Sequence, residues 1–254
     1  MYKFIFLLLF SALVYGQEQN GVKTIHVYVA LCDNINQGIV PVSKSLGNGQ
    51  DPKSNLYWGA LYGVKTHFKK SKDWTLIQTL ENPNSNILER VLFKHKETNT
   101  YLLADAYDGA FIKQTTIDFL KAASGDLKEM VAYNNNTLGF GGNAGLVVYI
   151  GHDGLMEFDL DVTLKSCDDN ERDAIMLACI SKNYFAPYLE KTGARPLVWT
   201  TGLMAPEAYT LKSAIDGWVL GETDLQIRER AAAAYHKYQK CGMRGARNLL
   251  VTGY

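Results

Sequence analysis

Short apolar runs, each the length of one strand, recur along this chain and constrain its fold most. The clearest are residues 24–31 (TIHVYVAL), 146–150 (LVVYI) and 173–178 (DAIMLA). Strands with one solvated face alternate polar and apolar side chains, whereas strands covered on both faces are apolar almost throughout, and these are typical of parallel sheets. The runs therefore predict a mostly parallel sheet with helices on both sides.

Helical patterns lie between these runs. Apolar residues recur at helical spacing after residue 54, Gly193 suits the end of a helix that follows the third run, and Thr223 with Gln226 forms a capping box. Helices are expected over 54–70, 115–123, 206–219 and from 223 to Gly242, and loops over 32–53 and 134–145. Strands are expected over 74–80 and 196–201. Paired short strands over 89–96 and 100–104 should form a hairpin or an edge, and a strand or hairpin is expected over 156–164. Strands alternating with helices predict a doubly wound α/β fold with right-handed crossovers.

The amino terminus has the pattern of a secretory signal peptide. Lys3 precedes the apolar stretch 4–14, and small residues lead to Gly16 before a polar segment. The stretch is too short to span a bilayer. We therefore expect residues 1–16 to be removed and residues 17–254 to form one domain, periplasmic or extracellular, without stable membrane insertion.

Charge and motifs exclude several functions. The chain carries 26 basic and 26 acidic residues, so its balance does not favour nucleic acid, and a peptide or protein substrate is the expected partner. There is no Walker A, GxSxG, HExxH or EF-hand motif. The glycine-rich segment 139–145 precedes a strand, whereas a phosphate cradle needs a helix there. The acidic segment 168–173 is expected to be a solvated turn, and no cofactor and no metal is predicted.

The cysteines do not form a disulfide framework. Cys32, Cys167, Cys179 and Cys241 are far apart and have no CxxC spacing. The sequence neither predicts nor excludes one disulfide bridge, between Cys167 and Cys241.

Two of the apolar runs are followed by side chains that could act together. His152 follows 146–150, and Cys179 follows 173–178. The carboxyl ends of neighbouring parallel strands meet at one edge of a sheet, so a thiol nucleophile and an imidazole base would meet there. A helix after Cys179 is expected to lower the pKa of its thiol. The alternative is that Cys179 is a small buried hydrophobe and His152 a structural residue.

These residues resemble a known family. An apolar strand ending in a His-Gly element, here His152-Asp153-Gly154, followed by another ending in Ala178-Cys179, is similar to the caspase-like cysteine peptidases of clan CD, such as caspases, legumains, clostripain, gingipains and separases. The resemblance extends over roughly residues 24–218. It implies the caspase-hemoglobinase fold, a flavodoxin-like three-layer sandwich, and cleavage after a specific P1 side chain.

The resemblance also implies residue roles. Cys179 would attack the scissile carbonyl, His152 would protonate the leaving amine, and the backbone amides of Gly154 and Cys179 would form the oxyanion hole. In the family, glycine usually follows histidine directly, but here Asp153 intervenes, and the separation from His152 to Cys179 is short. These departures keep two alternatives open: a catalytically inactive relative that binds peptides or partners, and a flavodoxin-like binding or hydrolytic module in which Cys179 is only buried.

The family builds its S1 pocket from loops at the same edge of the sheet. In this chain those positions are Asp33 after the first strand, and Thr200, Thr201 and Gly202 after a later one. Asp33 would suit a basic P1 side chain through charge pairing. The alternative is that Asp33 only caps a turn.

Overall fold

A mixed, mostly parallel sheet forms the centre of the molecule in the computed structural model, which describes residues 21–254. The 8-stranded sheet has the order β10-β9-β8-β7-β1-β4-β3-β2. Strands β9, β8, β7, β1 and β4 are parallel neighbours, whereas β3 pairs antiparallel with β4 and β2, and β10 pairs antiparallel with β9. The strands are β1 (Lys23–Ala30), β2 (Trp74–Leu80), β3 (Ile87–His95), β4 (Thr100–Tyr107), β7 (Leu146–Ile150), β8 (Asp173–Leu177), β9 (Arg195–Thr200) and β10 (Leu250–Val251).

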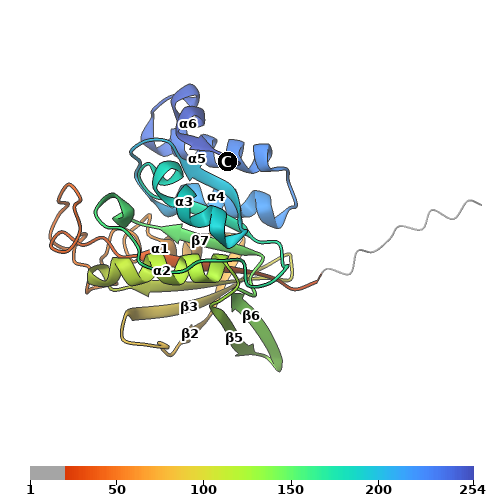
Figure 1. Cartoon of the computed structure of the whole chain (residues 1–254). Helices are drawn as coiled ribbons and strands as arrows, with labels where there is room; N and C mark the ends of the chain where they lie inside the picture. Colours follow the sequence, from red (N-terminus) through yellow and green to blue (C-terminus); the bar gives the residue numbers. More distant parts are fainter. Residues whose placement is uncertain (1–20) are drawn as a thin grey trace, which may run out of the picture.

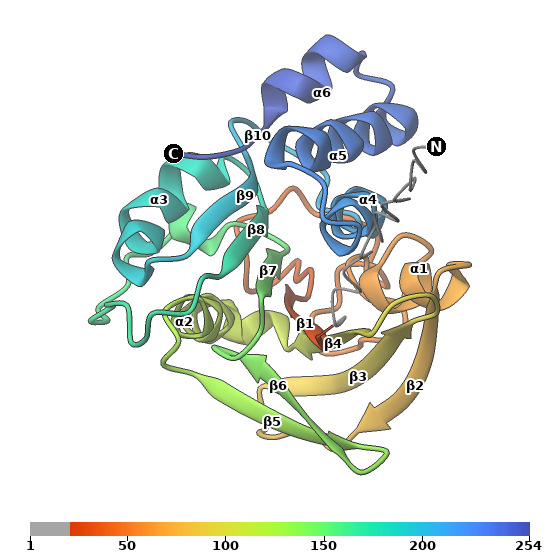
Figure 2. The ribbon, with the colours of Figure 1, turned by 90° about the vertical axis from the view of Figure 1, so that its right-hand side faces the viewer.

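Helices cover both faces of this sheet, as in a three-layer α/β sandwich (Figure 2). Helices α2 (Ile112–Ala123) and α3 (Ser181–Thr192) pack on one face, and α1 (Val64–Lys70), α4 (Ala208–Val219) and α5 (Asp224–Gln239) pack on the other. Every residue of β7 is buried, because side chains on both of its faces enter a core. The predicted α/β class with a mostly parallel sheet is confirmed.

The predicted helix over residues 54–70 is too long. Only α1, from Val64 to Lys70, is helical, and turns precede it. The buried side chain of Asn55 accepts hydrogen bonds from the backbone N–H groups of Cys32 and Tyr57 and donates to the Cys32 carbonyl at 2.8 Å. These bonds tie the backbone to the end of β1 and compete with helix formation.

The strand pair predicted over 89–96 and 100–104 forms the hairpin β3–β4, but β4 is not an edge strand. It lies between β1 and β3, and all of its residues are buried. The edge is β2. The predicted loop over 134–145 is wrong in its first half, because β5 (Lys128–Tyr133) and β6 (Asn136–Gly141) form a separate hairpin. Asn134 and Asn135 take positive φ angles of 47° and 61° at its turn, which asparagine tolerates well.

One further predicted element differs. The segment 156–164 is neither a strand nor a hairpin. A short 3₁₀ turn, η2 (Gly154–Met156), is followed by an irregular stretch whose Leu160 and Leu164 are buried in the core beside α2 and α3. The last predicted helix, from 223 to Gly242, is confirmed as α5, and a further short helix, α6 (Met243–Leu249), follows it.

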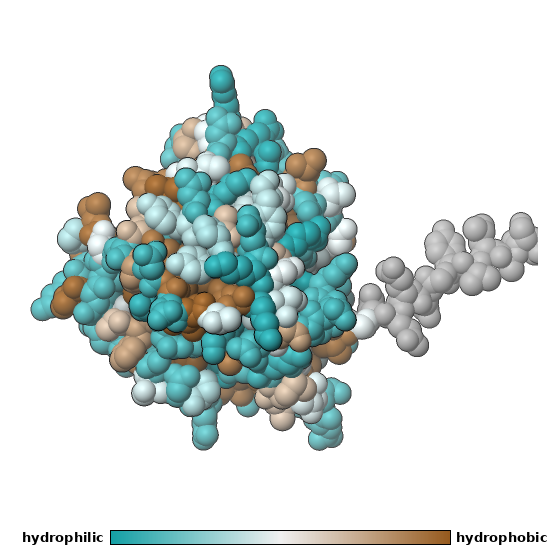
Figure 3. All heavy atoms as spheres, viewed as in Figure 1, coloured by the Kyte–Doolittle hydropathy of each residue, from teal (hydrophilic) through white to brown (hydrophobic). Residues whose placement is uncertain are grey.

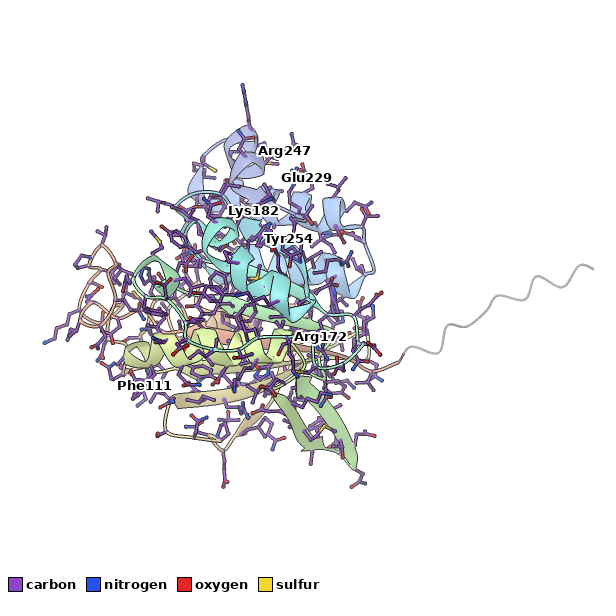
Figure 4. The ribbon with its side chains drawn as sticks, viewed as in Figure 1. Phe111, Arg172, Lys182, Glu229, Arg247 and Tyr254 are labelled. Carbon is purple, nitrogen blue, oxygen red and sulfur yellow. The ribbon has the colours of Figure 1, made fainter. Side chains whose placement is uncertain are left out.

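Helix α6 is attached to α5 by an ion pair. The Nε atom of Arg247 lies 2.9 Å from the Glu229 carboxylate, and Figure 4 shows the two residues together at the top of the molecule. The chain then returns to the sheet as β10, which pairs with β9. None of the helices within residues 21–254 is long and apolar enough to cross a membrane. The predicted signal peptide over 1–16 lies outside the described residues.

Candidate functional site

His152 and Cys179 stand at equivalent places on two neighbouring parallel strands. Ile150 at the end of β7 pairs with Leu177 at the end of β8, and each of the two side chains follows its strand end by two residues. The loops after β1 and β7 project on the left in Figure 1, at the carboxyl ends of the strands. Both His152 and Cys179 line one cavity of about 310 Å³ there.

The Cys179 thiol is half-buried against the backbone of Met204. The Met204 N–H donates to the Cys179 Sγ atom at 3.4 Å, and the Sγ atom lies 3.6 Å from the Met204 carbonyl oxygen. Burial raises the pKa of the Cys179 thiol, and the nearby Asp153 adds to this, although the hydrogen bond with Met204 opposes it. The resting thiol is therefore protonated at neutral pH.

This result corrects the expectation that the following helix lowers the pKa of the thiol. Ile180 separates Cys179 from α3 and takes a left-handed conformation with φ of 51°. The first helical N–H, that of Ser181, donates to the Thr200 hydroxyl at 3.1 Å. Because this amide is engaged with Thr200, it does not stabilise a thiolate at Cys179.

The His152 imidazole is held through one ring nitrogen. Its Nε2 atom forms a short hydrogen bond with the Glu157 carboxylate. The same Glu157 oxygen accepts the backbone N–H of Gly38 at 2.7 Å. A Cβ atom on Gly38 would lie 2.4 Å from that oxygen, so a larger residue there would displace the Glu157 carboxylate. Glu157 thus joins His152 to the loop after β1, and Nδ1 is the ring nitrogen left for proton transfer.

His152 and Cys179 are not hydrogen-bonded to each other in the described part of the chain. The imidazole pairs with Glu157, and the thiol contacts the Met204 backbone. Glu157 is not predictable from the sequence, where its only signal is a carboxylate five residues after a histidine. Hydrogen bonds between catalytic groups are often long before a substrate binds and tighten afterwards.

Asp153, the residue inserted between His152 and Gly154, is fully buried. Its Oδ1 atom accepts the N–H of Leu155 at 3.1 Å and caps η2, and its Oδ2 atom has no hydrogen-bond partner in residues 21–254. Burial raises the pKa of the Asp153 carboxyl to about 7, and the negative charge of Glu157 adds to this. Below that pH the side chain is mostly neutral.

Gly154 begins η2 and is not among the residues that line the cavity. An added Cβ atom would lie 2.5 Å from the Phe158 ring, so this glycine is needed for packing. Its role in an oxyanion hole stays a prediction.

Asp33 lies outside the cavity and caps a turn, as in the alternative interpretation. Its carboxylate accepts the N–H groups of Ile35 and Asn36 and the side-chain amides of Asn36 and Gln50. Burial alone would raise the pKa of Asp33, but these hydrogen bonds lower it below its ordinary value. Four donors leave this buried carboxylate little capacity to bind a basic side chain.

The three residues predicted at the end of β9 do not line the cavity either; Thr200 is the last residue of the strand, and Thr201 and Gly202 follow it. Thr200 is buried and bonds to the Ala178 carbonyl, Thr201 donates to the Asn248 carbonyl at 2.7 Å, and the Gly202 carbonyl accepts the N–H of Ile180 at 2.9 Å. The residues that follow them do line it, namely Leu203, Met204 and Pro206.

A second cluster of titratable groups lies away from the cavity. His26, Asp105 and Glu129 have ligand-type atoms within 4.8 Å of one another. The Arg90 guanidinium, however, binds Asp105 through two nitrogens, at 2.6 and 2.5 Å, and Glu129 at 3.0 Å. A cation already occupies the position between these carboxylates. The cluster is therefore an ion-pair network that joins β1, β3, β4 and β5.

All four cysteines are free thiols. Cys167 and Cys241 are both exposed, so the bridge between them that the sequence left open is not formed. Cys32 is buried at the end of β1, and burial raises the pKa of its thiol to about 11.

Comparisons of the chain with protein-family models, with curated proteins and with solved structures find no match.

Proposed function

We propose that this chain is an exported, periplasmic or extracellular cysteine endopeptidase, in which Cys179 attacks the peptide bond and His152 transfers the proton. The observation that carries the proposal is that both side chains follow the ends of paired parallel strands and line one cavity. The resemblance to clan CD peptidases and to their caspase-hemoglobinase fold belongs to this proposal. The order of β4, β1, β7, β8 and β9 in the sheet supports it, because the two residues follow adjacent strands.

The chemistry begins with a proton transfer from the Cys179 thiol to the Nδ1 atom of His152. The thiolate then adds to the substrate carbonyl carbon, and the imidazolium returns the proton to the leaving amine as the C–N bond breaks. Water, deprotonated by His152, hydrolyses the resulting thioester and regenerates the thiol. The substrate is thus a peptide or protein, and these steps use no cofactor.

Glu157 supports this sequence of steps in two ways. Its carboxylate accepts a hydrogen bond from Nε2 of His152, which fixes the tautomer with Nδ1 free. It also stabilises the imidazolium that forms when the thiol loses its proton. A base oriented by a third group is a recurring arrangement in nucleophilic catalysis.

A second candidate is an inactive relative that binds peptides. The observation in its favour is that the resting Cys179 thiol contacts the Met204 backbone, has a raised pKa and makes no hydrogen bond with His152 among the described contacts. In this case the cavity binds a peptide, and the thiol is only part of its wall.

The two candidates are separated by a cleavage experiment. Purified residues 17–254 are incubated with a degenerate peptide library between pH 5 and pH 8, and new termini are identified by mass spectrometry. The peptidase predicts cleavage at defined sites, which both Cys179→Ala and His152→Ala abolish while their circular dichroism stays unchanged. Peptide binding without cleavage, retained in Cys179→Ala, would establish the binding module instead.

A further inference from the structure

The walls of the cavity beside Cys179 are apolar. Two loops supply most of them: residues 38–40 after β1 and residues 203–206 after β9. The apolar lining residues are Ile39, Val40, Tyr57, Met156, Leu203, Met204 and Pro206, with Gly38 and Gly151 completing the wall. Apart from His152 and the Cys179 thiol, no lining residue carries an acidic or basic side chain.

Three of these apolar residues are exposed to solvent at the mouth of the cavity. The exposed fractions are 88% for Val40, 71% for Leu203 and 38% for Met156. Apolar residues are visible on the left-hand side of the molecule in Figure 3, where these loops project. An apolar rim around a concave site is typical of a surface that a ligand covers, because the exposed side chains gain free energy when water is removed from them.

The chemistry of the walls selects the kind of side chain that can enter. The Glu157 carboxylate beside the lining residues His152 and Gly38 is already hydrogen-bonded to both. A charged side chain would therefore lose hydration among the apolar walls without gaining a free opposite charge, which is unfavourable. Asp33, the acidic residue predicted to select a basic side chain, is outside the cavity and hydrogen-bonded to four donors. A volume of about 310 Å³ lies at the lower end of the range for ligand pockets, and suits one large side chain.

We infer that the peptidase cleaves after a large apolar residue, such as leucine, methionine or phenylalanine, whose side chain is bound between loops 38–40 and 203–206. This inference rests on the proposed function, because it takes the cavity beside Cys179 as the pocket for the residue whose carbonyl is attacked. The substrate is then a peptide segment that exposes a large apolar side chain, such as an unfolded or extended stretch of protein.

The inference is tested with a matched series of fluorogenic tetrapeptides. They share Ala-Ala-Ala and end in leucine, phenylalanine, methionine, alanine, arginine or aspartate before the cleaved amide. We expect kcat/KM for the peptides with a large apolar residue to exceed kcat/KM for the alanine peptide by about tenfold or more. The excess over the arginine and aspartate peptides should be larger still. Equal or faster cleavage after arginine or aspartate would overturn the inference.

Two variants at exposed positions locate the pocket. Val40→Glu places a carboxylate at the mouth of the cavity, and Ile35→Glu places one on the same loop but outside the lining. Val40 and Ile35 are 88% and 86% exposed, so neither substitution disturbs the core. We expect Val40→Glu to lower kcat/KM for the leucine peptide about tenfold and to raise that for the arginine peptide, with Ile35→Glu unchanged. The same preference in all three proteins would overturn the assignment of this pocket.

The outcomes also separate this inference from the proposed function. Cleavage that depends on Cys179 and His152 but shows no apolar preference refutes the inference and leaves the peptidase intact. Absence of cleavage of every peptide in the series and in the degenerate library refutes both.

Discussion

Replacing Asp153 by asparagine should make the protein's stability much less dependent on pH. The Asp153 carboxyl is fully buried, and its Oδ2 atom has no hydrogen-bond partner in the described structure. Burial raises its pKa from 3.8 to about 7. In the unfolded chain the carboxyl returns to its ordinary pKa, so the folded state binds this proton more tightly than the unfolded state does.

The size of the effect follows from this difference in pKa. A tenfold change in a protonation equilibrium corresponds to about 1.4 kcal/mol, so the difference is worth roughly 4 kcal/mol. Because the pKa is raised on folding, this stability is fully present below about pH 4. It is lost progressively as the pH rises to about 7, and the loss is complete above that.

Asp153→Asn removes this titration and keeps the shape of the side chain. Its carbonyl oxygen can still accept the N–H of Leu155, whereas its amide nitrogen takes the unpartnered position of Oδ2. That unpartnered amide costs about 1–3 kcal/mol at every pH. This cost therefore shifts the free energy of unfolding of Asp153→Asn by a constant amount. It does not change how the difference between the two proteins varies with pH.

The assay is urea unfolding of the wild type, Asp153→Asn and the control Asp161→Asn at pH values from 4 to 8. Asp161 is an exposed residue in the same irregular segment. Across this range we expect the free energy of unfolding of the wild type to fall by roughly 4 kcal/mol relative to that of Asp153→Asn. The free energy of unfolding of Asp161→Asn should depend on pH in the same way as that of the wild type. Parallel curves for the wild type and Asp153→Asn would refute the reasoning.

Three further predictions follow from named contacts. Glu157→Gln should lower kcat for peptide cleavage about tenfold with little change in KM, because the imidazolium loses a charged partner; steady-state kinetics test this, and an unchanged kcat would contradict it. Arg90→Leu should lower the free energy of unfolding by about 3–5 kcal/mol, because the buried Asp105 carboxylate loses both hydrogen bonds to the guanidinium and is left with the one with His26; urea unfolding tests this, and a loss under about 1 kcal/mol would contradict it. Thr223→Ala should cost about 1 kcal/mol by removing a capping box, measured in the same way, and a neutral result would show that α5 does not need its cap.

Much of the sheet was predictable from local sequence. Helices cover both faces of β1, β7 and β8, so these strands are apolar almost throughout. The sequence therefore shows them as continuous apolar runs over 24–31, 146–150 and 173–178. The proximity of His152 and Cys179 followed from the same observation, since parallel neighbours end at one edge.

Elements that depend on distant contacts were not predictable in this way. The turns before α1 depend on Asn55 binding the backbone of Cys32, and no local periodicity records that contact. The position of β4 inside the sheet is a matter of topology, because a buried hairpin strand and a buried central strand look alike in sequence. The β5–β6 hairpin does carry a local signal, Asn134-Asn135, but the same residues are also typical of a loop.

The chemistry around the two central residues was the least predictable part. Glu157 reaches His152 because it ends the 3₁₀ turn η2, where its backbone N–H bonds to the Gly154 carbonyl, and no sequence pattern indicated that turn. The pKa of Cys179 depends on burial, on the Met204 backbone and on the charge of Asp153, none of which strand and helix patterns reveal.

The central claim is that His152 activates Cys179 as a nucleophile, and a peptidyl acyloxymethyl ketone tests it most directly. This reagent is bound as a substrate is and is captured by an active thiolate, and the exposed Cys167 and Cys241 serve as internal references. Mass spectrometry of residues 17–254 at pH 7 should show labelling confined to Cys179, slowed at least about tenfold in His152→Ala. Labelling of Cys179 only after unfolding, or at the same rate in His152→Ala, would contradict the account.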